Sequence, residues 1–74
     1  MLPKQLRNKI PIETGSIVIV FYGMGCNSGI VLKTDKRKSL IRYIDNKQEF
    51  VYNKRISVVQ DLKLKNFIIR QLGF

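Results

Sequence analysis

The sequence predicts an all-β domain, built as a five-stranded antiparallel barrel with a short C-terminal helix. Short segments rich in β-branched and aromatic residues alternate with short polar turns, which is typical of an antiparallel meander that closes on itself. These turns leave no room for the long crossovers that parallel strands require. With 74 residues, the chain has the length of one domain.

The predicted strands follow Gly15 and are separated by turn-forming residues. The first, residues 16–22, is apolar at successive positions, so we expect other parts of the protein to cover both of its faces. A loop over residues 23–28 follows, because glycines and Asn27 interrupt the pattern. The other predicted strands are residues 29–34, 39–44, 49–52 and 56–59. The turns between them are the polar segments 35–38, 45–48 and 53–55.

After Asp61 the apolar pattern changes to the period of a helix. The positions that recur at i, i+3, i+4 and i+8 are Leu64, Phe67, Ile68 and Leu72. Asp61 is suited to the N-cap and Gly73 to the C-terminal stop. We expect this apolar side either to close the open end of the barrel or to form a dimer or partner surface. The chain thus divides into a basic N-terminal arm (1–14), the barrel (15–60) and an amphipathic helix (61–74).

The net charge is the strongest global signal in the composition. Fourteen Lys and Arg residues oppose five Asp and Glu residues, which gives a formal charge of +9. Such an excess creates a positive potential that attracts phosphate or other acidic surfaces. We therefore expect nucleic acid as the partner, with an acidic protein surface as the alternative. A third interpretation is that the basic residues serve solubility or reflect a bias in coding composition.

The residues that usually perform catalysis or bind metals are scarce. There is no histidine, which removes the commonest general base, and Cys26 is the single cysteine. The carboxylates fall mostly in turns or at strand ends, where they commonly cap backbone amides. We therefore expect no enzyme activity, no metal, no cofactor and no disulfide. Without a long apolar segment or a signal peptide, we expect no membrane partner and an intracellular location in the cytoplasm, nucleoid or nucleus.

Part of the chain resembles a known family. A Tudor domain opens with a glycine and a strand ending in an aromatic residue, and here these are Gly15 and Val18 to Tyr22. The later parts of the Tudor pattern correspond to Ser28 to Val31, Tyr43 to Asn46 and Phe50 to Ile56. Residues 15–59 thus resemble a Tudor domain, one of the SH3-like small β-barrels. The resemblance implies a five-stranded SH3-like barrel of Tudor type.

The resemblance also implies a place for an aromatic cage. Tudor domains that bind methylated lysine or arginine surround the cation with aromatic rings. Tyr22 and Tyr43 fall on cage positions and Phe50 is one place away, whereas Ser28 and Glu49 stand near places where an aromatic residue is usual. The alternatives for the tyrosines are packing inside the barrel and stacking on a base or a sugar.

Clusters of basic residues give the leading functional hypothesis. The candidate nucleic-acid-binding residues are Lys33, Lys36, Arg37, Lys38, Arg42, Lys54 and Arg55. Basic residues interleaved with tyrosine on a small barrel suit a surface that follows phosphates, so we expect a small non-catalytic protein that contacts the backbone of DNA or RNA with low sequence specificity. Such a protein would suit a phage or another accessory factor. The alternative is a protein-interaction module, which could be an inhibitor or a homo-oligomer that associates through the helix.

Overall fold

The computed structural model describes residues 10–73, and the part of the predicted arm over residues 1–9 lies outside the described residues. The order of elements is five strands, a short 3₁₀ helix before the last strand, and a C-terminal α-helix. The strands are β1 (Ile17–Tyr22), β2 (Gly25–Thr34), β3 (Lys38–Tyr43), β4 (Gln48–Tyr52) and β5 (Ile56–Val58). The 3₁₀ helix η2 spans Asn53–Arg55, and the α-helix α1 spans Leu62–Leu72.

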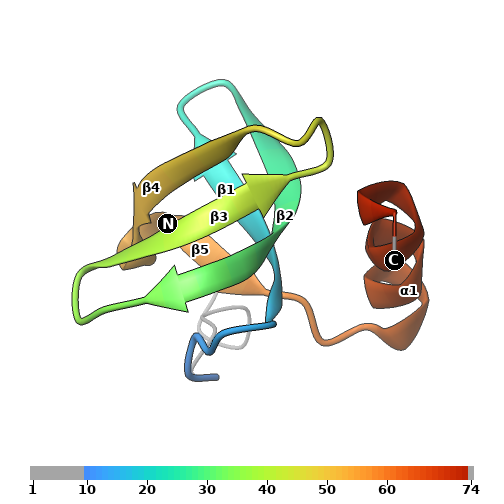
Figure 1. The fold of residues 1–74 in the computed structure, drawn as a ribbon, viewed down its shortest axis with the longest axis horizontal. Helices are drawn as coiled ribbons and strands as arrows, with labels where there is room; N and C mark the ends of the chain where they lie inside the picture. Colours follow the sequence, from blue (N-terminus) through green and yellow to red (C-terminus); the bar gives the residue numbers. More distant parts are fainter. Residues whose placement is uncertain (1–9, 74) are drawn as a thin grey trace.

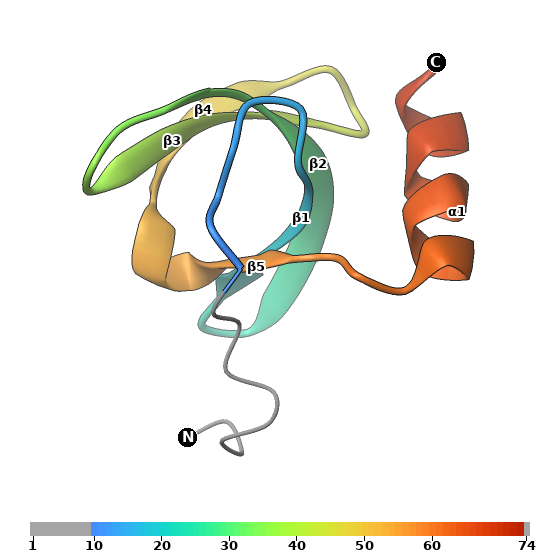
Figure 2. The same cartoon turned by 90° about the horizontal axis from the view of Figure 1, so that it is seen from below.

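The strands form one antiparallel sheet in the order β4-β3-β2-β1-β5. Figure 2 shows that the sheet is strongly curved, with α1 standing outside it next to β1 and β2. Among the described residues, the edge strands β4 and β5 do not pair with each other, so the sheet is not closed into a barrel. The predicted strands and helix are therefore confirmed, but the predicted closure is not.

The inner face of the curved sheet holds the larger of two apolar clusters. Its buried members are Val18, Val20, Val31, Ile41, Tyr43, Val51 and Ile56. Gly29 allows β2 and β3 to approach closely here, because a Cβ atom at this position would lie 2.5 Å from the carbonyl oxygen of Arg42. Ile12 packs against the same cluster, and Figures 1 and 2 show its segment passing below the sheet, across the lower opening of the curve.

The outer face of β1 and β2 is covered by α1. Ile17 and Val59 form a second buried cluster with Ile68 and Leu72 of the helix. Strand β1 therefore buries side chains on both faces, as its uninterrupted apolar sequence predicted, because neighbouring strand residues point to opposite sides. The helix lies against this outer face (Figure 1), whereas one of our two expectations placed it over an open end of the barrel.

The predicted ends of the helix are confirmed. The side chain of Asp61 accepts a hydrogen bond from the backbone N–H of Lys63 at 2.9 Å, as an N-cap does. Gly73 has a φ of 88°, a left-handed conformation that glycine adopts without steric cost, and its N–H bonds to the carbonyl of Arg70. Local side-chain and backbone chemistry thus determined both ends.

Every predicted strand has a boundary that differs from the structure, by four residues at the start of β2 and by one residue elsewhere. Residues 25–28 were expected in a loop, but they extend β2 and pair with residues 19–22 of β1. Backbone N–H and C=O groups make this pairing, so the glycines and Asn27 do not prevent it. Ile44 was expected at the end of a strand but lies in the turn after β3, where it packs against the outer cluster near α1.

Candidate nucleic-acid interface

Two basic segments that are distant in the sequence lie together in the structure. One runs from Lys36 in the turn before β3 to Lys38, the first residue of β3. The other is the 3₁₀ helix η2, which contains Lys54. The side-chain amide of Asn53 donates hydrogen bonds to the carbonyl oxygens of Asp35 (2.8 Å) and Lys36 (3.3 Å). The backbone N–H of Asn53 donates to the carbonyl of Arg37 at 2.7 Å. Asn53 therefore fixes the two basic segments side by side.

The buried hydroxyl of Ser39 holds Asn53 in this orientation. Ser39, only 1% exposed, donates a hydrogen bond from its hydroxyl to the Oδ1 atom of Asn53 at 2.7 Å. The hydroxyl oxygens of Ser39 and Thr34 lie 2.8 Å apart, within hydrogen-bonding distance. A buried hydroxyl without a partner costs free energy, so this chain of hydrogen bonds stabilises one arrangement of the turn.

Tyr52 lies at the centre of the basic segments. It pairs with Lys38 across β3 and β4, and the Lys38 ammonium lies 4.9 Å from the centre of the Tyr52 ring. The Lys54 ammonium lies 5.9 Å from the same centre. Both distances are within the range of cation–π attraction, so each ammonium group lies beside the Tyr52 ring. A shallow hollow of about 290 Å³ lies beside them, lined by Lys36, Arg37, Tyr52, Asn53 and Lys54.

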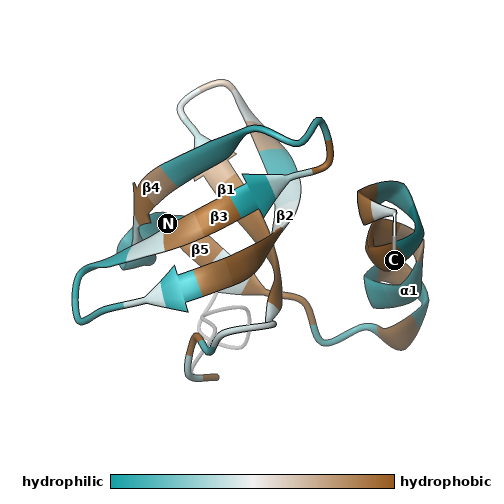
Figure 3. Cartoon of the chain, viewed as in Figure 1, coloured by the Kyte–Doolittle hydropathy of each residue, from teal (hydrophilic) through white to brown (hydrophobic). Residues whose placement is uncertain are grey.

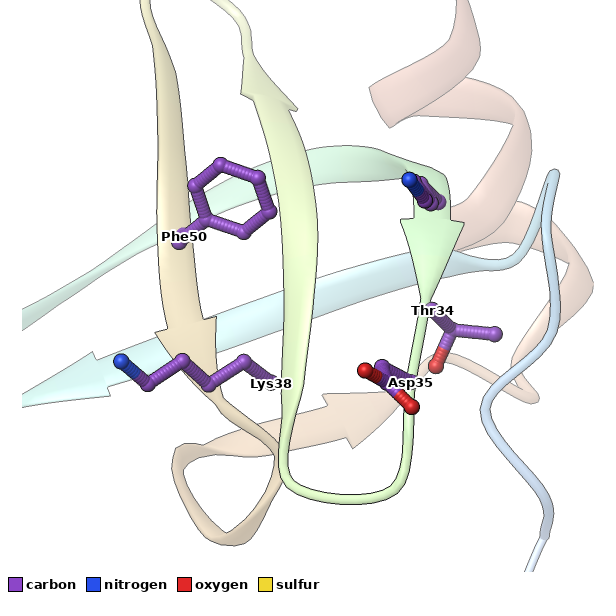
Figure 4. A pocket seen from close by; sticks show the side chains of 5 residues that line it. Thr34, Asp35, Lys38 and Phe50 are labelled. Atoms are coloured by element: carbon purple, nitrogen blue, oxygen red, sulfur yellow. The ribbon is translucent and has the colours of Figure 1, made fainter.

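Phe50 lies next to this group on the same outer face. It is two residues before Tyr52 on β4, while Val51 between them is buried in the inner cluster. The Phe50 ring is 64% exposed. A second hollow, of about 180 Å³, is bounded by Phe50 and Lys38 on neighbouring strands and by Lys33, Thr34 and Asp35 at the end of β2 (Figure 4).

Figure 3 shows how polar and apolar residues are divided on the sheet. The turn between β2 and β3 is hydrophilic, whereas the central parts of β1, β2 and β3 are hydrophobic. Asp35 is the acidic residue of this turn, and its Oδ1 atom accepts the backbone N–H of Lys36 at 2.7 Å. This carboxylate thus caps the turn, as expected from the sequence.

The structure separates Arg42 from this surface. Its guanidinium donates to the Oδ1 atom of Asn46, at 3.0 Å from Nε and 2.6 Å from Nη2, and Nη2 also donates to the carbonyl of Leu72 at 3.2 Å. Arg42 therefore contacts the C-terminal end of α1, where a positive charge complements the helix dipole. The other predicted arginine, Arg55, is exposed at the end of η2.

The predicted aromatic group is divided between the two faces of the sheet. Tyr22 and Tyr43 lie together with ring centres 6.5 Å apart, and Tyr43 is only 3% exposed. Burial, then the neighbouring Tyr22 and Glu49, raises the pKa of Tyr43 well above its ordinary value, so its hydroxyl stays protonated and donates to Oε1 of Glu49 at 3.4 Å. Phe50 lies on the opposite face from Tyr43, as the strand register requires.

Tyr52 was not among the predicted site residues. The signal was present in the sequence, because residues two apart in a strand share a face and Tyr52 follows Phe50 at that spacing. Of the predicted basic residues, the structure brings together Lys33, Lys36, Arg37, Lys38 and Lys54. We call this group, with Phe50 and Tyr52, the basic aromatic surface.

Comparison with known protein families and curated sequences finds no match for this chain. The resemblance to Tudor domains therefore depends on the residue pattern alone. Within residues 10–73, no helix has both the length and the apolar character needed to cross a membrane, and no three His, Cys, Asp or Glu side chains are grouped so that they could hold a metal ion.

Proposed function

We propose that this chain is a small non-catalytic nucleic-acid-binding protein that contacts the phosphate backbone with low sequence specificity. The observation that supports the proposal most directly is the basic aromatic surface, where Asn53 joins two basic segments beside two exposed rings. We also propose that the curved sheet is of SH3-like type. Its meander order and the short turn before Ile56 support this assignment.

The chemistry of the surface suits phosphate better than a neutral ligand. Lysine and arginine side chains bind phosphate oxygens and displace the counterions that surround a nucleic acid. Contacts to phosphate position a protein on its ligand without identifying the bases. The lining of the two hollows includes five cations and one carboxylate, and that carboxylate already caps a turn.

The salt dependence of binding tests this proposal. Fluorescence anisotropy would measure affinity for duplex and single-stranded probes between 50 and 200 mM salt. Affinity for duplex DNA should fall with a log–log slope of about −0.9 for each phosphate contacted. Replacing Lys36, Arg37 and Lys38 together with alanine should make that slope shallower by about 2 to 3.

A control with the same change in net charge makes the test specific. Lys63, Lys65 and Arg70 are exposed on α1, so replacing these three with alanine removes the same charge at another place. We expect this helix variant to keep most of the wild-type slope. The proposal fails if wild-type protein binds no probe at low salt, or if the two triple variants weaken binding equally.

Protein interaction through α1 is a second candidate function. Although Ile68 and Leu72 are buried against the sheet, Phe67 and Leu64 of the same predicted surface are 56% and 40% exposed. Leu62 is also exposed, at 69%. A partner captured by the wild-type protein, but not by a Phe67→Ala variant, in high salt and after nuclease treatment would favour this function. Methyl-lysine reading has less support, because Tyr43 is buried and Phe50 lies on the other face.

A further inference from the structure

The exposed ring of Phe50 requires an explanation that phosphate contacts do not provide. Lysine side chains alone would suffice to attract a phosphate backbone, yet a phenylalanine that is 64% exposed lies among them. Covering an apolar ring with another flat apolar surface removes both from water and lowers the free energy. Lys33 and Lys38 border the same hollow together with Asp35, so two cations and one carboxylate surround whatever covers Phe50.

Nucleic acid bases have both a flat face and a neighbouring negative charge. In a duplex, the faces of the bases are covered by their neighbours, so they cannot stack on a protein ring unless they are unpaired. In a single strand, each base can leave the stack and cover an aromatic side chain. The pairing of a ring with cations at Phe50 therefore fits a single strand better than a duplex.

The distances along β4 also fit a strand with separated bases. Phe50 and Tyr52 are two residues apart on one face, which corresponds to about 6.8 Å along a strand. This is about twice the rise of 3.4 Å per nucleotide along one strand of B-DNA. Tyr52, with the ammonium groups of Lys38 and Lys54 at 4.9 and 5.9 Å from its ring centre, therefore follows Phe50 at a spacing that a strand with separated bases can match.

Resting on the proposed function, we infer that the basic aromatic surface binds single-stranded nucleic acid, with one unpaired base stacked on Phe50. The phosphate next to that base lies at Lys38 and Lys54, whose ammonium groups lie beside the Tyr52 ring. Stacking does not depend on base identity, because every base has a π face. The surface therefore discriminates by strandedness and not by sequence.

Three probes of equal length separate stacking from phosphate binding. They are a single-stranded oligonucleotide, the same backbone with abasic sites in place of the bases, and a duplex. The first probe is made as both DNA and RNA, so that the experiment identifies which sugar the protein prefers. The variant is Phe50→Ala, and the matched control is Phe67→Ala, because Phe67 is a similarly exposed phenylalanine on α1.

The expected result is specific to the probe that has unpaired bases. Phe50→Ala should weaken single-strand binding by about 5- to 150-fold, the range measured for loss of one stacked base. It should leave the abasic and duplex affinities within about twofold of wild type, as should Phe67→Ala for all probes. Phe50→Trp should keep the single-strand affinity that Phe50→Ala loses, because tryptophan also stacks. Lys38→Ala should weaken the binding of all three probes.

The result that overturns stacking differs from the one that overturns nucleic-acid binding. If wild-type protein binds single-stranded and abasic probes equally, or if Phe50→Ala and Phe67→Ala behave alike, stacking on Phe50 is wrong although phosphate binding remains. If no probe binds, both proposals are wrong. Circular dichroism confirms that each variant folds, and an upfield shift of the Phe50 ring protons on adding the oligonucleotide reports stacking directly.

Discussion

The outer face of the sheet has two halves with opposite character. Over β1 and β2, the isoleucines Ile17, Ile19 and Ile30 pack against α1. Over β3 and β4, the same face presents Lys38, Phe50 and Tyr52, and among the described residues no helix or strand covers this half. Figure 1 shows α1 standing beside β2, away from β4.

This difference shows how a small sheet can be stabilised by packing on one half and still leave the other half exposed to a ligand. An apolar strand face must be covered, and α1 supplies that cover where the outward residues are isoleucines. Where the outward residues are Lys38 and Tyr52, their polar ends can remain in water, while the Phe50 ring is left exposed. Packing is thus concentrated on one half, and the other half is available for a ligand.

The largest expected effect comes from breaking the covered half. Ile68 is 1% exposed in the cluster between α1 and the sheet, so Ile68→Ala should lower the free energy of unfolding by about 2 to 4 kcal/mol. The neighbouring Phe67 is 56% exposed, and Phe67→Ala should change the free energy of unfolding by less than about 1 kcal/mol. Urea denaturation measures both. Equal losses would show that the helix does not pack as described.

The next effect concerns the frame of the open half. Asn53→Ala removes the acceptor of the buried Ser39 hydroxyl and the donor to two carbonyl groups, which should cost about 1 to 3 kcal/mol. Because the basic segments then lose their fixed arrangement, nucleic-acid affinity should also fall although no charge changes. Asn66→Ala, an exposed position on α1, is the control. Unchanged amide exchange in the turn before β3 would contradict this role.

Arg42 lies at the boundary between the halves, and its substitution sharpens the comparison. Arg42→Gln should lower the free energy of unfolding by about 1 kcal/mol, because the guanidinium bonds to Asn46 and to the C-terminal carbonyl of α1. It should reduce nucleic-acid affinity less than Lys54→Gln does, which removes the same charge. Paired anisotropy titrations measure both losses. A larger loss of affinity for Arg42→Gln than for Lys54→Gln would show that Arg42 belongs to the ligand-binding surface.

The smallest effect on stability is expected at Lys38. Its ammonium lies near the Tyr52 ring at the surface, so Lys38→Ala should cost no more than about 1 kcal/mol. The same change should measurably weaken nucleic-acid binding. Thermal unfolding and anisotropy on the same sample compare the two effects. A stability loss as large as that of Ile68→Ala would mean that Lys38 belongs to the structural half.

Local chemistry in the sequence determined most of the elements. The β-branched runs placed five strands, the helical period placed α1, and Asp61 and Gly73 fixed its ends, because each of these signals acts within a few neighbouring residues. The continuous apolar sequence of β1 also predicted cover on both faces. The same reasoning failed at residues 25–28, where backbone pairing with β1 outweighed the loop-forming side chains.

Only the tertiary structure decided how these elements combine. The sequence identifies the basic residues, but the hydrogen bonds of Asn53 bring Lys36 to Lys38 beside Lys54, although Asn53 and its partner Asp35 are 18 positions apart in the sequence. Likewise, nothing in the sequence distinguishes Arg42 from the other candidate basic residues. In the structure α1 lies beside it, and its guanidinium donates a hydrogen bond to the carbonyl of Leu72 at the helix end. Such placements depend on contacts between distant segments, which no local pattern encodes.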